Sequence, residues 1–377
     1  MDAVDVTVVG GGIVGCAAAA ACARRGLGTV LLEQEDGLGR GITSRNSEVA
    51  HGGMYYPAGS LKARCCVRGR RLLKEFCLGH GVAYRECGKL IVAVSDDEVP
   101  ELERLLELGR SNGVEDLQLL DALAVARLEP EVRAVAALWS PRTGILDAEG
   151  AAKAYGAAAA RDGAQILTGC EVHGLERAGG VWQVAVRQAG EGRREGWTHG
   201  SRHVINCAGI RADAVATMAG LDVDALGWRQ IPVKGNYYRI APRHEGRIGR
   251  LVYPVPPQDH SSLGVHLCLD LAGGLRLGPD VEWKSLDSAG ALDYDVDPAR
   301  AAGFFAGAVR FLPWLEPGDL SPDMVGYRPK LAVDGFRDFV LDEGAGDSAG
   351  LINLVGIDSP GLTSAAALAE DVALLVG

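Results

Sequence analysis

The chain has 377 residues, 47% of them hydrophobic, and its formal net charge at neutral pH is −11. This length is sufficient for two domains or for one large α/β body with a sizeable buried core. The acidic balance excludes a broad nucleic-acid-binding surface, because such a surface needs clustered positive charge. It does not exclude an anionic small-molecule substrate, which needs only local cations.

Nine cysteines occur without a Cys-x-x-Cys pair, which predicts reduced thiols in a reducing compartment. No signal peptide or membrane-spanning segment is expected, because the first apolar strand pattern begins at Val4. We expect a cytoplasmic protein, or one of an organelle matrix if a transit peptide was removed, and peripheral membrane contact stays open. No metal site is expected, since there is no HExxH motif or Cys/His cluster.

The strongest motif stands first, in VDVTVVGGGIVGCAAAAACARRGLGTVLLEQE. It predicts a buried strand over residues 4–9, a Gly-x-Gly-x-x-Gly turn, an Ala-rich helix and a second strand over residues 29–32. In such a dinucleotide-binding unit Gly10 permits the tight turn, Gly12 lets a pyrophosphate approach, and Gly15 allows close helix packing. The helix N-terminus would face the phosphates.

Glu33 ends the second predicted strand, 18 residues after Gly15. A carboxylate at this place can accept hydrogen bonds from ribose hydroxyls, which favours FAD or NAD over NADP. The motif alone does not separate FAD from NAD. The residues of this unit predicted to bind the dinucleotide are Gly10, Gly12, Ile13, Val14, Gly15, Glu33 and Gln34.

The polar loop TSRNSEVAHGGMYYPAGSLKARCC follows, and it places a histidine and two tyrosines just after the nucleotide-binding unit. Helices are then predicted over residues 60–78, in DDEVPELERLLELGRSNG and over residues 147–161, with a strand in ECGKLIVAVS between the first two. Antiparallel strands are expected in AQILTGCEVHGLE and GVWQVAVRQ, with a polar hairpin near residues 190–201. HVINCAGIRADAVATMAG again reads as strand, glycine turn and helix.

Residues 230–277 have a mostly β pattern, an amphipathic helix is predicted over residues 297–315, and the chain closes with a strand, a Gly/Pro turn and a long apolar helix. Nucleotide-binding elements thus recur at the start, middle and end. This layout predicts an α/β protein with a glutathione-reductase-like (Rossmann-type) FAD-binding domain and an interleaved mixed β-sheet substrate domain. We assign residues 1–56, 143–224 and 337–377 to the first domain and residues 57–142 and 225–336 to the second.

The chain resembles the L-2-hydroxyglutarate dehydrogenase/oxidase family, within the D-amino-acid-oxidase-like flavoproteins. The stretches that carry this resemblance span almost the whole length: SRNSEVAHGGMYYPAGSLKARCCVRGRRLL, CGKLIVA, PVKGNYY, LVYPVP, LGVHLCLDLAG, GPDVEW, GYRPKL and GIDSPGLTSAAALAE. The chain departs from the family pattern at Met54, where isoleucine is usual, at Gly52, where another small residue is usual, and around residues 188–202.

The resemblance implies non-covalent FAD, with a covalent link through His51 as the alternative. It implies hydride transfer from the α-carbon of L-2-hydroxyglutarate to flavin N5, giving 2-oxoglutarate. The loop after Glu33 would run towards the flavin, and the turn before the last helix would lie at its pyrimidine edge. The electron acceptor stays open between oxygen, a quinone and an electron-transfer protein. Further predicted cofactor-binding residues are Ser44, Arg45, Asn46, Ser47, His51, Gly53, Val172, Cys207, Ala208, Gly209, Gly356, Ser359, Pro360, Gly361, Leu362 and Thr363.

Two histidines are candidates for the general base that accepts the hydroxyl proton. An imidazole suits this role because its pKa lies near neutrality. His51 would lie near the flavin, and His266 lies in a strand pattern with apolar neighbours, so its side chain faces the opposite way from theirs. The structural alternatives are a histidine that hydrogen-bonds within a polar loop for His51 and one on a sheet face for His266.

Arg328 and Lys330 alternate along a predicted strand, so their side chains should point to the same side. Arg328 is predicted to hold the α-carboxylate of a 2-hydroxy diacid in a bidentate pair, and Lys330 or Lys234 the distal carboxylate. Tyr55 is predicted near the substrate entrance. The alternatives are an exposed strand with two solvated cations and a tyrosine in the core.

The nearest rival functions are an oxidase of small amino acids, of the glycine or sarcosine type, and a glycerol-3-phosphate dehydrogenase-like enzyme. An amino-acid oxidase needs only one carboxylate clamp, so the paired cations count against it. An NAD-dependent dehydrogenase and a non-catalytic flavoprotein are further alternatives, which a colourless protein or an unreducible flavin would favour.

Overall fold

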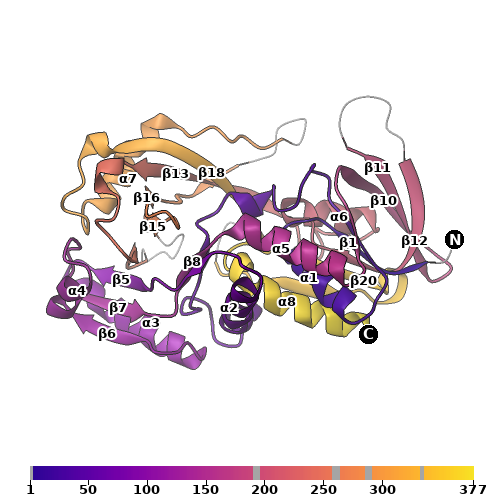
Figure 1. The fold of residues 1–377 in the computed structure, drawn as a ribbon, viewed down its shortest axis with the longest axis horizontal. Coiled ribbons are helices and arrows are strands. Elements are labelled where there is room, and N and C mark those ends of the chain that lie inside the picture. Colours follow the sequence, from indigo (N-terminus) through magenta and orange to yellow (C-terminus); the bar gives the residue numbers. More distant parts are fainter. Residues whose placement is uncertain (1–2, 190–195, 257–263, 285–290, 332–334) are drawn as a thin grey trace.

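A computed structural model describes residues 3–189, 196–256, 264–284, 291–331 and 335–377. Figure 1 shows one large sheet with its helices in the right half of the view and a second large sheet in the left half. A third, three-stranded sheet consists of β3 (Val49–Ala50), β8 (Gly144–Leu146) and β4 (Tyr84–Arg85), in that order. The architecture is α/β with mixed sheets, as predicted.

The first large sheet has a parallel centre in the order β9-β2-β1-β12-β20, to which antiparallel strands are added. In β1, Val6 and Val8 pack with the helices on one face, while Val9 packs on the other face. This alternation buries both sides of the parallel strands. The strands are β1 (Val4–Val9), β2 (Thr29–Leu32), β9 (Gln165–Leu167), β10 (Cys170–Ala178), β11 (Val181–Gln188), β12 (Gly196–Asn206), β19 (Val340–Glu343) and β20 (Leu351–Val355).

Helix α1 (Ile13–Arg24) is buried on nearly every side, which explains its almost uninterrupted alanines. It contacts α5 (Ala148–Arg161) and α8 (Gly361–Val376), and α8 in turn packs on α2 (Leu61–Gly79). These helices lie together in Figure 1. Helix α6 (Ala212–Met218) contacts β10 and β20.

The second large sheet has the order β17-β13-β16-β15-β14-β5-β7-β6, and β18 pairs antiparallel with β13. Its strands are β5 (Lys89–Ala93), β6 (Gln118–Asp121), β7 (Ala136–Ser140), β13 (Ile231–Ile240), β14 (Leu251–Pro254), β15 (Leu267–Leu269), β16 (Leu275–Leu277), β17 (Glu282–Trp283) and β18 (Leu320–Lys330). The helices beside it are α3 (Val99–Ser111), α4 (Ala122–Leu128) and α7 (Ala301–Ala308).

The strands of the first large sheet all fall in the segments predicted for the dinucleotide-binding domain. The strands of the second fall in those predicted for the substrate domain. Helix α2 is the exception, because it belongs to a predicted substrate segment yet packs on α8. The domain boundaries therefore stay a prediction. The two large sheets agree with the predicted segments, but the packing of α2 on α8 does not.

Three elements differ from their predicted extent. The strand predicted in AQILTGCEVHGLE is two strands, of which β10 pairs antiparallel with β11 as predicted, while β9 pairs parallel with β2. The helix predicted over residues 297–315 is limited to α7, because Gly307 weakens its last turn and Pro313 cannot continue it. Strand β12 begins at Gly196, which pairs with Arg187, so the predicted hairpin at residues 190–201 is shorter. Residues 190–195 of that hairpin lie outside the described residues.

All nine cysteines are free thiols, and seven of them are buried. Burial raises the pKa of these thiols, for example that of Cys66 to about 12, so they stay protonated at neutral pH. No helix in the described part of the chain is long and apolar enough to cross a membrane.

Candidate active site

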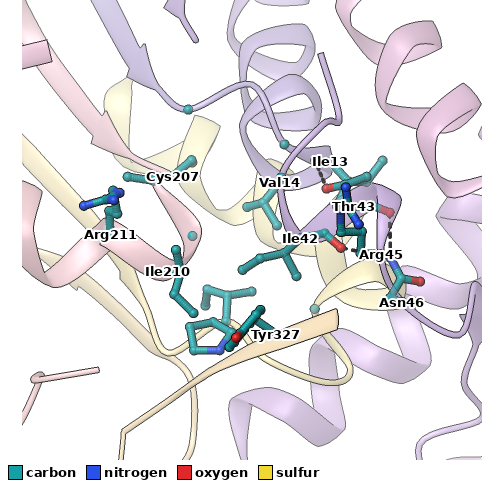
Figure 2. A pocket seen from close by; sticks show the side chains of 18 of the residues that line it. Ile13, Val14, Ile42, Thr43, Arg45, Asn46, Cys207, Ile210, Arg211 and Tyr327 are labelled. Atoms are coloured by element: carbon teal, nitrogen blue, oxygen red, sulfur yellow. Dashed lines mark hydrogen bonds between the residues drawn. The ribbon is translucent and has the colours of Figure 1, made fainter. Parts of the chain in front are cut away.

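One cavity of about 1140 Å³ is lined by residues of both large sheets. It begins at the glycine turn after β1 and reaches the strands of the second sheet at Arg328. Figure 2 shows its wall near Ile13, with side chains from α1 and from the loop that follows β2. Twenty of the predicted site residues line it: Gly10, Gly12, Ile13, Val14, Glu33, Gln34, Arg45, Asn46, Ser47, His51, Val172, Cys207, Ala208, Gly209, His266, Arg328, Ser359, Pro360, Gly361 and Leu362.

The glycine turn after β1 leaves no room for side chains. Gly10 has a φ of 106°, and a Cβ on it would lie 2.5 Å from the carbonyl oxygen of Cys207. A Cβ on Gly15 would lie 1.9 Å from the carbonyl oxygen of Gly10. Both neighbours are backbone atoms that cannot move aside. The turn therefore requires glycine for the reasons that the motif predicts.

Glu33 holds its carboxylate in the cavity wall just beyond β2. The backbone N–H of Gly11 donates to Glu33 Oε2 at 2.5 Å, and the N–H of Glu35 donates to Oε1 at 2.8 Å. Burial raises the pKa of this carboxyl, and the two N–H donors oppose that shift. An oriented acceptor in this place can bind ligand hydroxyls.

The loop after β2 is fixed by its own polar side chains. The backbone N–H of Ile13 donates to Thr43 Oγ1 at 3.0 Å, a contact drawn in Figure 2, and this joins the start of α1 to the loop. The amide of Asn46 donates to the carbonyl of Thr43 at 2.6 Å. Ser47 Oγ lies 2.9 Å from the hydroxyl of Tyr237, which connects the loop to β13. The loop is thus a preformed wall between the two sheets.

His51 lies where this loop meets the turn before α8. Its backbone N–H donates to Thr363 Oγ1 at 2.9 Å, and Thr363 Oγ1 donates to the carbonyl of Val49 at 3.2 Å. The imidazole Nε2 is 3.5 Å from Ser359 Oγ, and Nδ1 is buried without a partner among the described residues. Burial holds the pKa of His51 well below its usual value, so the ring is neutral at pH 7.

His266 immediately precedes β15 rather than lying within it, a small correction to the predicted strand position. Its Nδ1 is 2.9 Å from the carbonyl oxygen of Gly264, so Nδ1 carries the proton and donates. Its ring stacks on Tyr253 with centroids 3.9 Å apart. Burial lowers the pKa of His266 to about 3. The ring is therefore neutral, and its Nε2 is the unprotonated nitrogen.

Arg328 brings a partly buried cation to the same cavity. Its guanidinium donates to the carbonyl of Asp280, but it forms no ion pair with any acid in the described part of the chain. Burial lowers its pKa because it disfavours the charged form, yet a guanidinium stays protonated at neutral pH. Its remaining N–H groups can bind an anionic ligand.

Three predicted substrate residues do not line the cavity. Lys234 Nζ lies 2.6 Å from Asp293 Oδ2, because successive strand residues face opposite sides and its neighbour Gly235 faces the cavity. Lys330 Nζ lies 5.9 Å from the ring centroid of Trp283. The Tyr55 ring lies behind the wall, beside the ammonium of Lys89.

Five predicted cofactor residues shape the wall without lining it, namely Gly15, Ser44, Gly53, Gly356 and Thr363. Thr363 positions His51, as described above. The Ser44 hydroxyl is used within its own turn, where it donates to the carbonyl of Arg40. Gly53 has a φ of 106° and packs on Val67. The N–H of Gly356 donates to Gln230 at 2.8 Å.

Several residues at the site were not singled out from the sequence: Thr43, Lys89, Tyr237, Tyr253 and Asp358. Strand alternation could have identified Tyr237, since it lies two residues after Gly235 and both line the cavity. A lysine at the start of the apolar run KLIVA was the available signal for Lys89. The stacking of Tyr253 on His266 had no local signal.

A family model described as FAD dependent oxidoreductase, or DAO, matches residues 5–375. The chain belongs to this family of FAD-dependent oxidoreductases. Among its relatives, mitochondrial L-2-hydroxyglutarate dehydrogenase of Arabidopsis thaliana is 36% identical over 99% of this chain and 83% of the relative. The enzyme of the same name in Homo sapiens is 32% identical over 98% of this chain and 88% of the relative. The family resemblance predicted from the motifs is thereby confirmed.

Solved structures agree with the FAD-binding fold. L-alpha-glycerophosphate oxidase of Mycoplasma pneumoniae, reduced with dithionite and with FAD bound, is 26% identical with a TM-score of 0.86, covering 100% of this chain and 95% of that one. Glycine oxidase of Geobacillus kaustophilus has a TM-score of 0.80 at 21% identity, covering 100% and 95%, and shows the fold alone. The predicted flavoprotein fold is confirmed.

The cavity fits FAD. The glycine turn and the N-terminus of α1 suit a pyrophosphate, and the Glu33 carboxylate beyond β2 suits a ribose. At the other end, His51 and the N-terminus of α8 at Gly361 line the same cavity, as a flavin ring would require. Roles of individual residues towards FAD stay predictions.

Gly15→Ala is expected to abolish FAD binding and to destabilise the protein. The added methyl group would overlap the Gly10 carbonyl oxygen, so α1 must move away from β1. Overpacking of this kind costs about 1–3 kcal/mol or more. The flavin-to-protein absorbance ratio and the thermal midpoint measure both effects. Gly303→Ala in α7 is the matched control, since a Cβ there meets nothing within 4 Å and the residue has no positive φ. Equal flavin content in the two variants would contradict the prediction.

Proposed function

We propose that the chain oxidises L-2-hydroxyglutarate to 2-oxoglutarate with FAD. The names and full-length similarity of the relatives support this substrate. The site observation that carries the proposal is a partly buried guanidinium, Arg328, in one cavity with two neutral histidines. Within the described part of the chain this guanidinium has no acid partner. FAD, when bound, takes up the hydride equivalent from the α-carbon.

Arg328 is proposed to bind the α-carboxylate of the substrate. A planar guanidinium can hold a carboxylate through two parallel N–H donors, which also fixes the orientation of the α-carbon. Burial strengthens this contact, because little water competes for either group. Among the described residues, the guanidinium makes one hydrogen bond, to the carbonyl of Asp280. The guanidinium is therefore both charged and available.

His266 is proposed to accept the hydroxyl proton. Its Nδ1 is committed to the Gly264 carbonyl, which leaves the lone pair of Nε2 for the substrate. In the ligand-free cavity its pKa is depressed by burial. An anionic substrate opposes that shift, because negative charge favours the imidazolium. His51 remains the second candidate, held at the turn before α8 and proposed to contact non-covalently bound flavin.

The test is anaerobic mixing of the purified holoprotein with L-2-hydroxyglutarate while the visible flavin band is followed. Rapid bleaching with the L enantiomer and none with the D enantiomer is the expected result. A flavin that stays oxidised with the L enantiomer would refute the substrate while leaving the FAD assignment intact. Glycine, sarcosine and glycerol 3-phosphate are the comparison substrates.

The electron acceptor is tested in the same experiment. Mixing the reduced protein with oxygen, a soluble quinone or an electron-transfer flavoprotein gives three reoxidation rates to compare. The relatives are named dehydrogenases and mitochondrial, which supports an acceptor other than oxygen and an organelle matrix as the location. We therefore expect oxygen to be the slowest of the three.

A further inference from the structure

Lys89, at the start of β5, is a fully buried lysine without a polar partner in the part of the chain that the structure describes. Its side chain has 0% exposure, and its Nζ makes no hydrogen bond within the described residues. The ammonium lies 4.5 Å from the ring centroid of Tyr55 and 4.7 Å from that of Tyr253. Tyr253 lines the cavity and stacks on His266. Lys89 is thus one tyrosine ring behind the cavity wall.

Such a side chain is unfavourable for stability. Burying an ammonium without an acid or a hydrogen-bond acceptor forfeits its hydration, and contact with two aromatic faces recovers only part of that loss. The following residues of β5, from Leu90 to Ala93, are apolar and buried. A methionine would fill the space of Lys89 without this penalty. Because the charge of Lys89 lowers stability, we looked to function for the benefit that the charge provides.

The titratable groups around Lys89 do not neutralise it. They are the phenols of Tyr55 and Tyr253, the thiols of Cys66 and Cys268, and the imidazoles of His51 and His266. Burial raises the pKa of each phenol and thiol, so these groups stay uncharged.

The helix that covers this part of the sheet adds no counter-charge either. Helix α3 contributes Glu101, whose negative charge helps to raise the pKa of Tyr55. The carboxylate of Glu101 accepts two hydrogen bonds from Arg104, at 2.6 and 2.7 Å. No carboxylate forms an ion pair with Lys89 among the described residues. The positive charge on this side of the cavity is therefore uncompensated.

We propose that Lys89 is a specificity-determining residue, whose buried ammonium behind Tyr253 favours substrates with a second carboxylate. This inference rests on the proposed function, in which Arg328 binds the α-carboxylate and the distal carboxylate still lacks a cation. Lys234 is paired with Asp293, and Lys330 does not line the cavity. Because the wall between Lys89 and the cavity is aromatic and Lys89 is fully buried behind it, the field of the ammonium reaches the substrate with little screening. Lys89 acts through this field and does not touch the substrate.

The effect should depend on pH in a defined direction. Burial lowers the pKa of Lys89 to about 7, opposed by the thiols of Cys66 and Cys268. The ammonium is charged below that pH and loses its charge as the pH rises through it. The KM for the diacid should therefore increase above about pH 7, while the KM for a substrate with one carboxylate stays nearly constant. This measurement needs only the wild-type protein.

The test compares L-2-hydroxyglutarate with its 5-amide, which has the same shape but lacks the second charge. Lys89→Met should lower kcat/KM for the diacid about tenfold and leave that for the amide nearly unchanged. Lys89→Arg should keep the preference and lose its alkaline decline. Lys153→Met, which removes an exposed cation paired with Glu149 on α5, is the charge-matched control and should change neither substrate.

Each outcome decides the proposal. A thermal midpoint of Lys89→Met at or above that of the wild type is expected, because a buried unpartnered charge is removed. Equal losses for the diacid and the amide would show a merely structural role and overturn it. If Lys89→Met does not fold, the wild-type protein provides the test. A preference for the diacid over the amide that stays constant from pH 6 to 9 would then overturn the proposal. A wild-type flavin that L-2-hydroxyglutarate does not reduce refutes the proposed function first, before any variant is compared.

Discussion

Replacing Arg328 with methionine is expected to lower kcat/KM for L-2-hydroxyglutarate by about 10²- to 10⁴-fold while the FAD content stays unchanged. Removing one member of a buried charge pair costs about 3–5 kcal/mol, and each 1.4 kcal/mol corresponds to about a factor of ten. The guanidinium has no ion-pair partner among the described residues, so the loss falls on the substrate complex rather than on the free protein.

Steady-state kinetics with the L enantiomer and the flavin absorbance of the purified variant measure the two parts of this prediction. Arg328→Lys should recover only part of the activity, because an ammonium cannot form the bidentate pair. Arg239→Met is the matched control, since Arg239 lies on the neighbouring strand β13 and pairs with Asp323 and Asp270 away from the cavity lining. Near-normal kinetics of Arg328→Met would remove Arg328 from the substrate site.

His266→Asn is expected to lower kcat by about 10²- to 10⁴-fold, the usual contribution of a positioned general base. Asparagine is the matched replacement, because its amide N–H can still donate to the carbonyl of Gly264 while no basic nitrogen remains. The stack against Tyr253 loses a ring, but the wall keeps its hydrogen bond. His266→Asn therefore tests the loss of the proton acceptor while the hydrogen bond that holds this part of the cavity wall is kept.

The reductive half-reaction, followed by stopped-flow absorbance with unlabelled and α-deuterated substrate, measures this loss at the chemical step. His51→Asn is the comparison, and a smaller effect is expected because His51 is placed by its backbone N–H on Thr363. A larger loss in His51→Asn than in His266→Asn would assign the base to His51. With either histidine as base, kcat should fall at low pH, because the neutral ring is the form that accepts the proton.

Much of the cofactor site could be predicted from local sequence. The spacing of Gly10, Gly12 and Gly15 and the acid at Glu33 specify a turn whose requirements lie within one strand-turn-helix unit. The turn before α8 is equally local, because it joins β20 to α8 within five residues and ends at Pro360, with Gly361 as the first residue of the helix. All of these residues except Gly15 line the cavity.

The substrate end was harder to predict, since it depends on pairs of distant residues. Alternation along β13 directs Lys234 away from the cavity, and Asp293 provides its counter-charge. Arg328 lines the cavity, but strand alternation alone did not decide this, because Lys330 lies two residues further along the same strand and does not line it. A cation can be assigned from sequence, but its partner cannot.

The sequence by itself determined the nucleotide-binding unit and the α/β class, because strand, turn and helix preferences act over short stretches of chain. Only the tertiary structure decided that Lys89 is buried between Tyr55 and Tyr253 and that His266 stacks on Tyr253. These contacts join strands from separate parts of the chain. Their direction and burial follow from how the second sheet is assembled, and no local pattern encodes that assembly.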